Sequence, residues 1–270
     1  MVDSGKNSEG IMAGKRGLIM GVANSHSIAW GITQAVAAQG AEVALTYQNE
    51  ALGKRVKPLA EEIGCDTLLQ CDVTDEVSVE ALFDTLKEKW GKLDFLVHSL
   101  AFSDKDELKG LYVDTSRDNF RDTMLISCYS LTTLAQKAVP LMTDGGSIIT
   151  LTFIGSRRVM PSYNVMGVAK AALEASARYL AVDLGPQGIR VNAISAGPMR
   201  TLAGAVIGDA RKVFRNSADT APMLRNATQQ EVGEAGLYLC SDLSSGVTGS
   251  ILHVDGGYHA MGMRIAEEES

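Results

Sequence analysis

Tyr163 and Lys170 are the two residues whose types and spacing best suit proton transfer in this sequence. Their separation corresponds to about two turns of an α-helix, so both side chains would project from the same face of one helix. A lysine ammonium can bind ribose hydroxyls and lower the pKa of a neighbouring phenol. The tyrosine can then act as an acid, or as a hydrogen-bond donor to a developing oxyanion. The alternative is a buried tyrosine and a surface lysine on an amphipathic helix.

A second candidate group lies where the first predicted strand runs into a helix. Gly21 would let the chain turn sharply off the strand, and Ser27 is placed to cap the helix that follows. The N-terminal amides and dipole of that helix could hold a pyrophosphate. The segment does not match G-x-G-x-x-G, so a strand–glycine–helix junction without a ligand is an alternative.

Polar residues also follow the second and third predicted strands. Gln48 stands where dinucleotide-binding folds place the residue that meets the adenosine ribose. An acidic residue there would favour NAD and an arginine NADP; Gln48 is neutral, so the choice stays open, with NADH preferred. Asp72 is placed to accept from the adenine amino group, and a capping aspartate is the alternative. Such features at successive strand ends together predict a dinucleotide site.

The elements that would position these residues are strands alternating with helices. Seven short apolar runs suit buried strands, namely Gly17–Met20, Glu42–Thr46, Thr67–Gln70, Phe95–His98, Ser147–Leu151, Arg190–Ile194 and Ile251–Val254. Amphipathic stretches of helical period lie between them, such as Ile28–Gln39, Val77–Trp90 and Ala169–Leu184. Continuous apolar strands linked by helices predict an α/β fold, a single-domain, Rossmann-type, doubly wound sheet of seven parallel strands. We expect an irregular region over residues 200–225 and a further helix from near Thr228.

Composition limits the possible partners and the compartment. A net charge of −7 argues against non-specific nucleic-acid binding, which needs a basic surface. None of the four cysteines forms a C-x-x-C pair, and the histidines show no ligand spacing, so we predict no metal site. These histidines are His26, His98, His253 and His259. The absence of a secretion signal or a membrane-spanning segment in the sequence predicts a cytoplasmic protein that does not bind membranes.

The whole chain, from about Gly14 to Met263, resembles the divergent bacterial enoyl-acyl-carrier-protein reductases of the short-chain dehydrogenase/reductase superfamily. The typical superfamily member has a Tyr-x3-Lys pair and a TGxxxGxG turn, and this sequence has neither. It matches the reductases in Tyr-x6-Lys, in the Gly-x5-Ser-Ile-Ala turn and in three further segments, Leu96–Phe102, Arg190–Pro198 with Thr201–Ala203, and Val254–Tyr258. The domain is then expected over residues 13–263, between a flexible N-terminus (1–12) and a tail (264–270).

The resemblance implies roles for individual residues. The cofactor is expected to be NADH, with NADPH not excluded, bound by Gly21, Ser27, Ile28, Gln48, Asp72, Val73, Ser99, Leu100, Ala101, Lys170, Met199 and Thr201. Tyr163 and Lys170 are implied as catalytic residues, with Tyr163 bonded to the thioester carbonyl. Ser103, Phe153, Tyr163 and Ala203 are implied to contact the substrate. The implied reaction transfers hydride to the β-carbon of a trans-2-enoyl thioester in fatty acid biosynthesis.

One residue departs from the family pattern. Most of these bacterial enzymes carry a second tyrosine ten residues before the catalytic one, where this sequence has Phe153. Phenylalanine donates no hydrogen bond but keeps an aromatic wall, and mycobacterial enoyl reductases also use phenylalanine in this region. Two alternatives are a carbonyl reductase of the same superfamily, such as a 3-oxoacyl-carrier-protein reductase, and a dinucleotide-binding sensor that has lost catalysis. The missing Tyr-x3-Lys pair counts against the first, and retention of Tyr163 and Lys170 against the second.

Partners follow from the same resemblance. The segment over residues 200–225 resembles the substrate-covering loop and helix of the family and carries several basic residues. We expect Arg211 and Lys212 to meet an acidic acyl carrier protein, the alternative being a solvated helix face. The resemblance also implies a homotetramer, with the last strand and the helix containing Ala169 near the subunit contacts.

Overall fold

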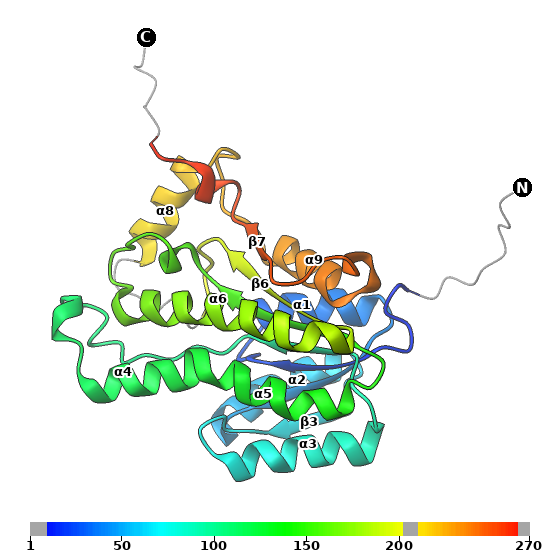
Figure 1. Ribbon diagram of the computed structural model, residues 1–270. Helices are drawn as coiled ribbons and strands as arrows, with labels where there is room; N and C mark the ends of the chain where they lie inside the picture. The colour runs from blue at the N-terminus through cyan, green and yellow to red at the C-terminus, as the bar shows by residue number, and fades with distance from the viewer. Residues whose placement is uncertain (1–9, 202–209, 264–270) are drawn as a thin grey trace, which may run out of the picture.

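The computed structural model describes residues 10–201 and 210–263, and within them the chain forms one parallel sheet in the order β3-β2-β1-β4-β5-β6-β7 (Figure 1). The strands are β1 (Arg16–Met20), β2 (Glu42–Tyr47), β3 (Thr67–Gln70), β4 (Phe95–His98), β5 (Gly146–Thr152), β6 (Ile189–Ala196) and β7 (Ile251–Val254). Strand order reverses between β1 and β4, which is where doubly wound sheets bind ligands. The predicted seven-stranded parallel sheet is confirmed.

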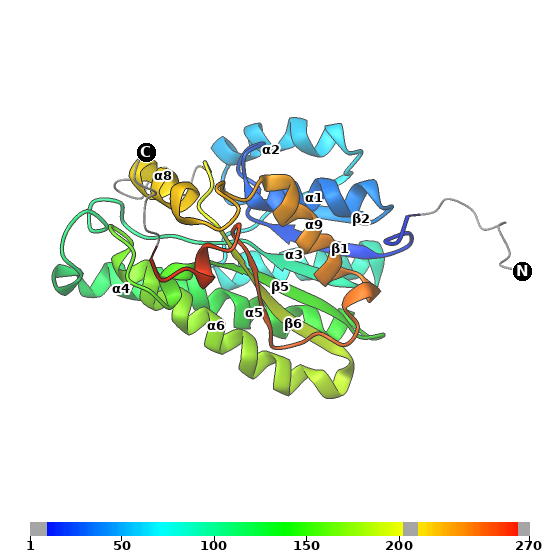
Figure 2. The same cartoon turned by 90° about the horizontal axis from the view of Figure 1, so that it is seen from above.

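Helices cover both faces of the sheet, with α1, α2 and α9 on one side and α5 and α6 on the other (Figure 2). The α-helices are α1 (Ile28–Ala38), α2 (Glu50–Glu62), α3 (Glu76–Trp90), α4 (Arg117–Met124), α5 (Ser130–Ala138), α6 (Asn164–Leu184), α8 (Ala210–Thr220) and α9 (Gln229–Cys240). A π-helical turn, η2 (Leu125–Tyr129), joins α4 to α5. The 3₁₀ turns are η1 (Tyr112–Asp114), η3 (Val139–Leu141), η4 (Ile154–Ser156), η5 (Gly185–Gln187), η6 (Asp242–Ser244) and η7 (Tyr258–Ala260).

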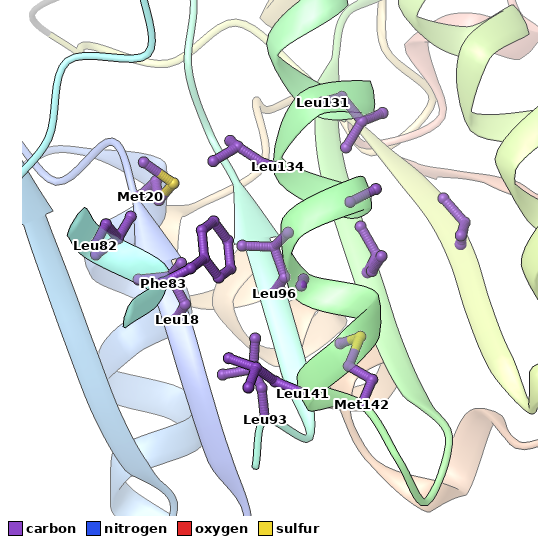
Figure 3. Close-up of a cluster of buried hydrophobic side chains, with 14 of the residues drawn as sticks. Leu18, Met20, Leu82, Phe83, Leu93, Leu96, Leu131, Leu134, Leu141 and Met142 are labelled. Carbon is purple, nitrogen blue, oxygen red and sulfur yellow. The ribbon is translucent and has the colours of Figure 1, made fainter. Parts of the chain in front are cut away.

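The sheet separates two apolar cores. Because side chains alternate along a strand, Leu18 and Met20 of β1 enter one core while Ile19 enters the other. The first core packs the strands against α3, α5 and α6, and Figure 3 shows part of it, including Leu96 of β4 and Leu131 and Leu134 of α5. The second core packs them against α1, α2 and α9. Both faces of the sheet are therefore covered by helices, as is usual for parallel sheets.

Helix boundaries agree with the sequence analysis at most positions. The helix expected near Thr228 begins there, and Thr228 forms a capping box with Glu231. Helix α6 begins at Asn164, earlier than the predicted Ala169. The expectation of an irregular region over residues 200–225 is wrong in part, because α8 is a helix whose sequence contains few apolar residues and whose one buried residue is the polar Ser217.

The ends of the expected domain also need correction. Met12 is fully buried, and its amide donates to the carbonyl of Gln39, so residues 10–12 belong to the fold and not to a flexible N-terminus. The remainder of that expected N-terminus (1–9), the tail (264–270) and residues 202–209, including Ala203, lie outside the described residues. Among the helices of the described part of the chain, none combines the length and the apolar composition needed to cross a membrane.

Candidate active site

The carboxyl ends of β1 and β4 meet backbone to backbone at the reversal of strand order. The amide of Ser99 donates to the carbonyl of Met20 at 3.1 Å. Gly21 has a φ of 103°, and a β-carbon there would lie 2.0 Å from the carbonyl oxygen of Ser99. Glycine is therefore required at this turn both for its backbone conformation and for space. The close approach leaves no room for a side chain at the start of the loop that leads to α1.

Ser27 is the N-cap residue of α1, as predicted, but its side chain makes no capping bond to the helix. The hydroxyl of Ser27 instead accepts from the amides of Ala23 at 3.0 Å and Asn24 at 3.1 Å, so the loop between β1 and α1 uses that oxygen to close on itself. Helix α1 begins at the half-buried Ile28 without a side-chain cap, which leaves its positive N-terminal end suited to an anion. Together with the turn at Gly21, where no side chain intervenes, this end of the helix is suited to a dinucleotide pyrophosphate.

The ends of β2 and β3 are joined by the two polar residues singled out in the sequence. The side-chain amide of Gln48 donates to Asp72 at 3.0 Å, and the other carboxylate oxygen of Asp72 accepts from the amide and hydroxyl of Thr74. Partial burial raises the pKa of Asp72, but the bonds from Thr74 and Gln48 outweigh it and lower the pKa. Asp75, not Asp72, caps α3. Val73 is half-buried beside this turn.

The loop that leaves β4 borders the site on its other side. Leu100 packs partly buried against the core, whereas Ala101 is exposed. Ser127, from the π-helical turn η2, fixes this loop: its hydroxyl accepts from the amide of Phe102 at 2.9 Å and donates to the carbonyl of the same residue at 3.0 Å. π-Helical turns occur frequently at functional sites, and this one packs against α6, the helix that carries the candidate catalytic lysine.

Tyr163 immediately precedes α6 and is buried, with an exposed fraction of 6%. Its ring packs edge-on against Phe153, with 5.2 Å between ring centroids and 73° between planes. A β-carbon on Gly155 would lie 2.4 Å from Tyr163 Cδ1, so the backbone there touches the ring. The expected lowering of the Tyr163 pKa is not observed, because burial, and then the charge of Glu174, raise that pKa. The phenol is therefore a neutral hydrogen-bond donor at physiological pH.

Lys170 lies within α6 and is also buried, with an exposed fraction of 5%. Its ammonium donates to the carbonyl of Leu151, at the end of β5, at 2.8 Å. Burial lowers the pKa of Lys170 to about 8, while the nearby Cys128 and Glu174 act in the opposite direction. The alternative of a surface lysine is wrong. Lys170 is a desolvated cation held at the carboxyl edge of the sheet.

The remaining predicted residues follow β4 and β6. Ser103 donates through its hydroxyl to Asn119 of α4 at 3.2 Å. Met199 packs against the second core, and its carbonyl accepts from the amide of Thr201 at 3.0 Å. The guanidinium of the intervening Arg200 lies 4.9 Å from the centre of the Phe214 ring, which ties this segment to α8.

Two buried titratable groups beside the site have no assigned role in the sequence analysis. Glu174 lies one turn after Lys170 on α6, and the only signal for it was an acid at a helical spacing of four residues. His98 bonds through its ring nitrogens to the hydroxyls of Thr150 and Ser130, each at 2.8 Å. Burial, with the charge of Lys170 added, lowers the pKa of His98 to about 3. His98 is therefore a buried, hydrogen-bonded residue of the fold.

His253, Asp255 and His259 gather near the end of β7, although their sequence spacing gave no sign of it. The two imidazole rings stack with centroids 4.0 Å apart and planes at 11°. Asp255 accepts from the amides of Gly257 and His259 and from Nδ1 of His259. One possible ligand atom from each of the three residues lies within 4.8 Å of the others, so the group is close enough to hold a metal ion. Nδ1 of His253 is buried and has no hydrogen-bond partner. The absence of a metal stays a prediction.

The fold and these residues define the class: a dinucleotide-binding oxidoreductase with a Tyr–Lys pair at the carboxyl edge of a doubly wound sheet. A family profile described as enoyl-(acyl carrier protein) reductase matches residues 21–259. The chain is 64% identical to an NADH-dependent enoyl-acyl-carrier-protein reductase from Rhizobium meliloti over 96% of both chains, and 58% identical to one from Rickettsia felis over 94% of this chain and 97% of the relative. The chain belongs to the enoyl-acyl-carrier-protein reductase family.

Solved structures agree with this assignment. The reductase from Anaplasma phagocytophilum, in complex with NAD, has a TM-score of 0.93 and 58% identity, covering 97% of this chain and 100% of that one. The reductase from Bacillus cereus, solved with NADP⁺ and an indole naphthyridinone, has a TM-score of 0.92 and 48% identity, covering 94% of this chain and 100% of that one. The predictions of family and of fold are therefore confirmed.

Proposed function

We propose that this chain is an NADH-dependent enoyl-acyl-carrier-protein reductase that saturates the carbon–carbon double bond of a trans-2-enoyl thioester. The observation that carries the proposal is the pairing of two buried groups, the phenol of Tyr163 and the ammonium of Lys170. Burial keeps the phenol protonated, and Tyr163 immediately precedes the helix that carries Lys170. When bound, the cofactor supplies hydride to the β-carbon of the substrate. The residues of the chain bind, orient and stabilise charge.

Tyr163 is the group proposed to act on the substrate. As negative charge develops on the thioester carbonyl oxygen, the neutral phenol donates a hydrogen bond to it from a site already removed from water. The α-carbon then gains a proton. Lys170 holds the ribose next to the nicotinamide by donating to its hydroxyls, and Leu151 orients the ammonium. Phe153 forms an aromatic wall beside Tyr163 and adds no hydrogen bond of its own.

The cofactor-binding roles are assigned to strand ends. Gly21, Ser27 and Ile28 surround the pyrophosphate, and Gln48 meets the adenosine ribose. The further contacts are proposed for Asp72 and Val73 at the adenine, Ser99, Leu100 and Ala101 along the dinucleotide, and Met199 and Thr201 at the carboxamide. Gln48 supports NADH because it lacks the positive charge that a 2′-phosphate would need. The four cysteines are free thiols, which suits the reducing cytoplasm where we place the reaction.

The acyl carrier protein is proposed to dock on α8. Arg211 and Lys212 are exposed on this helix, and the guanidinium of Arg200 stacks on its Phe214. Local positive charge on an acidic chain suits an acidic carrier. Ser103, Phe153 and Ala203, with Tyr163, are proposed to contact the acyl thioester that the carrier delivers.

We also propose that the functional unit is a homotetramer. Tyr179 and Val182 of α6 are each 76% exposed, and three residues apart they share one face of the helix. Tyr129 of η2 adds a third exposed apolar side chain on an adjoining element. β7, next to β6 in the sheet, is an edge strand whose residues are all partly exposed. Unpaired edges and apolar helix faces of this kind favour association with further copies.

The experiment that tests the function follows oxidation of NADH, and separately of NADPH, with a crotonyl thioester. Wild type should oxidise NADH, and Tyr163→Phe should lower kcat by roughly 10²–10³-fold, the typical effect of removing one oxyanion donor. NADH affinity should be unchanged in the variant. Tyr112→Phe, at a half-exposed tyrosine outside the site, is the matched control. Measurable NADH binding without turnover of carrier-linked or CoA-linked enoyl chains would instead support the sensor alternative.

A further inference from the structure

Glu174 is a charged side chain with an exposed fraction of 5%, and its carboxylate is bound from one segment of chain. Its Oε1 accepts from the hydroxyls of Thr152 at 2.9 Å and Ser156 at 2.5 Å, while Oε2 lies 3.4 Å from Nε of Arg157. These three partners lie at the start and at the end of the six residues that leave β5. One carboxylate on α6 therefore fastens both ends of that segment.

The fastened segment contains the two residues that contact the Tyr163 ring. Phe153 packs edge-on against that ring, and the backbone of Gly155 touches its Cδ1 side. The segment also approaches α6 directly, since a β-carbon on Gly167 would lie 2.8 Å from the carbonyl oxygen of Gly155. The position of the aromatic wall relative to the phenol therefore depends on how firmly residues 152–157 are held to α6.

The charge of Glu174 is neutralised only in part by its ion-pair partner, because Arg157 is half exposed and the contact is long. Several charged or titratable groups surround the carboxylate. On α6 itself they are Tyr163 and Lys170; from the segment after β5, Arg157; and from β7, His253. Cys128 of η2 and His98 of β4 are also close enough to Lys170 to interact with its charge. The negative charge raises the pKa of both Tyr163 and Lys170, so it favours the protonated form of each.

We propose that Glu174 is a positioning residue: its carboxylate fixes residues 152–157, and with them Phe153, against Tyr163, and keeps a negative charge beside Lys170. The proposal rests on the roles given above to Tyr163 and Lys170. In this proposal Glu174 does not itself contact substrate or cofactor, and acts through Phe153, Tyr163 and Lys170.

Two substitutions separate the two parts of this role. Glu174→Gln keeps an oxygen that can accept from Thr152 and Ser156 but removes the charge, whereas Glu174→Ala removes both. The pKa of Lys170 is measured by nuclear magnetic resonance on the enzyme without added cofactor, labelled with ¹³C at the lysine ε-carbon. The Lys170 signal is identified by its absence from the spectrum of Lys170→Met. The pKa of Lys170 should be about 8 in wild type and lower in Glu174→Gln. Glu80→Gln, at an exposed carboxylate that pairs with Lys137, is the control and should leave it unchanged.

Glu174→Ala tests the positioning directly. A crystal structure of this variant should show the Phe153 ring displaced from its 5.2 Å spacing to Tyr163. Its kcat should fall at least roughly tenfold, because misplacing groups at a reacting centre by about 1 Å can cost ~10²-fold. An unchanged Lys170 pKa in Glu174→Gln, or an unmoved Phe153 ring in Glu174→Ala with only a lower melting temperature, overturns the proposal. If Tyr163→Phe turned over normally, the role of Tyr163 would fail while both readouts on Glu174 would still be measurable.

Discussion

Gly21 and Ser99 belong to different strand ends, yet their backbones lie so close that one methyl group would not fit between them. A β-carbon on Gly21 would lie 2.0 Å from the Ser99 carbonyl oxygen and 2.7 Å from its carbonyl carbon. Both neighbours are backbone atoms of the residue that follows β4, whose amide is bonded to the last residue of β1, so they cannot rotate away as a side chain could. The loop that leads to α1 therefore starts from a fixed point, and its amides are preorganised for the anion that we propose they bind.

Gly21→Ala should abolish NADH binding as well as destabilise the fold. Gly64→Ala is the matched control, because Gly64 also has a positive φ, of 68°, but nothing lies within 4 Å of a β-carbon there. We expect Gly64→Ala to lower the free energy of unfolding by about 1–2 kcal/mol, the cost of a left-handed alanine, and to leave NADH affinity unchanged. Gly21→Ala should cost more than that in denaturant unfolding. Equal effects of the two variants on stability and NADH affinity would contradict the requirement for glycine at position 21.

The strands were predictable because each is a short run of mostly apolar residues between helical stretches. Thr67–Gln70, Phe95–His98 and Ile251–Val254 have the predicted bounds. Helix α8 was not predicted by pattern, because its short apolar face covers loops and not the sheet, and its buried residue is Ser217. The spacing of apolar residues reveals a helix when one of its faces is buried against a core. It gives no such signal for a helix at the rim of the molecule.

The site was predictable as a set of strand ends but not as a set of contacts. That Gln48 and Asp72 meet each other depends on the pairing of β2 with β3, which no local pattern encodes. The pKa of Tyr163 was predicted in the wrong direction, because the sequence shows a neighbouring lysine but not the depth of burial, which has the larger effect. Glu174 was missed for the same reason, since its partners come from the segment after β5.

His98 should make the folded state sensitive to acid. Its pKa is about 3 in the folded chain against 6.5 for the free side chain, because the ring is fully buried. Above pH 6.5 the histidine is neutral in both states and its contribution is complete; as the pH falls from 6.5 towards 3, only the unfolded chain takes up a proton, and stability is lost. At pH 5 this amounts to about 2 kcal/mol at 1.36 kcal/mol per pKa unit.

Denaturant unfolding of wild type and His98→Gln at pH 7 and pH 5 measures this contribution. Glutamine can still bond to the hydroxyls of Thr150 and Ser130 but does not titrate. We expect wild type to lose about 2 kcal/mol more than His98→Gln between the two pH values, whatever their difference at pH 7. Parallel losses in the two proteins would show that this ring is not the group responsible.

Reversing the charge of Arg211 and Lys212 together, as Arg211→Glu and Lys212→Glu, should impair delivery by the carrier but not the chemistry. We expect a KM for enoyl-acyl-carrier substrate raised roughly tenfold or more, with the KM for enoyl-CoA and both kcat values unchanged. The effect should weaken at high ionic strength, because both side chains are exposed. Lys54→Glu with Arg55→Glu, two exposed residues of α2, makes the same change of net charge elsewhere. Equal effects on both substrates would exclude a carrier-docking role for α8.

The exposed face of α6 gives a test of assembly. Replacing Tyr179 and Val182 by glutamate places two like charges where an apolar contact between subunits is proposed, and both side chains are 76% exposed in the single chain. Burying unpaired carboxylates is costly, so the tetramer should dissociate into smaller species in size-exclusion chromatography with light scattering. Val77→Glu, at a 73% exposed valine on α3, is the control and should leave the mass unchanged. Because the two α6 residues are solvent-exposed within one chain, thermal unfolding of the separated subunit should still be cooperative. A wild-type protein that is already monomeric, or a double variant that keeps the tetrameric mass, would show that this face is not a subunit contact.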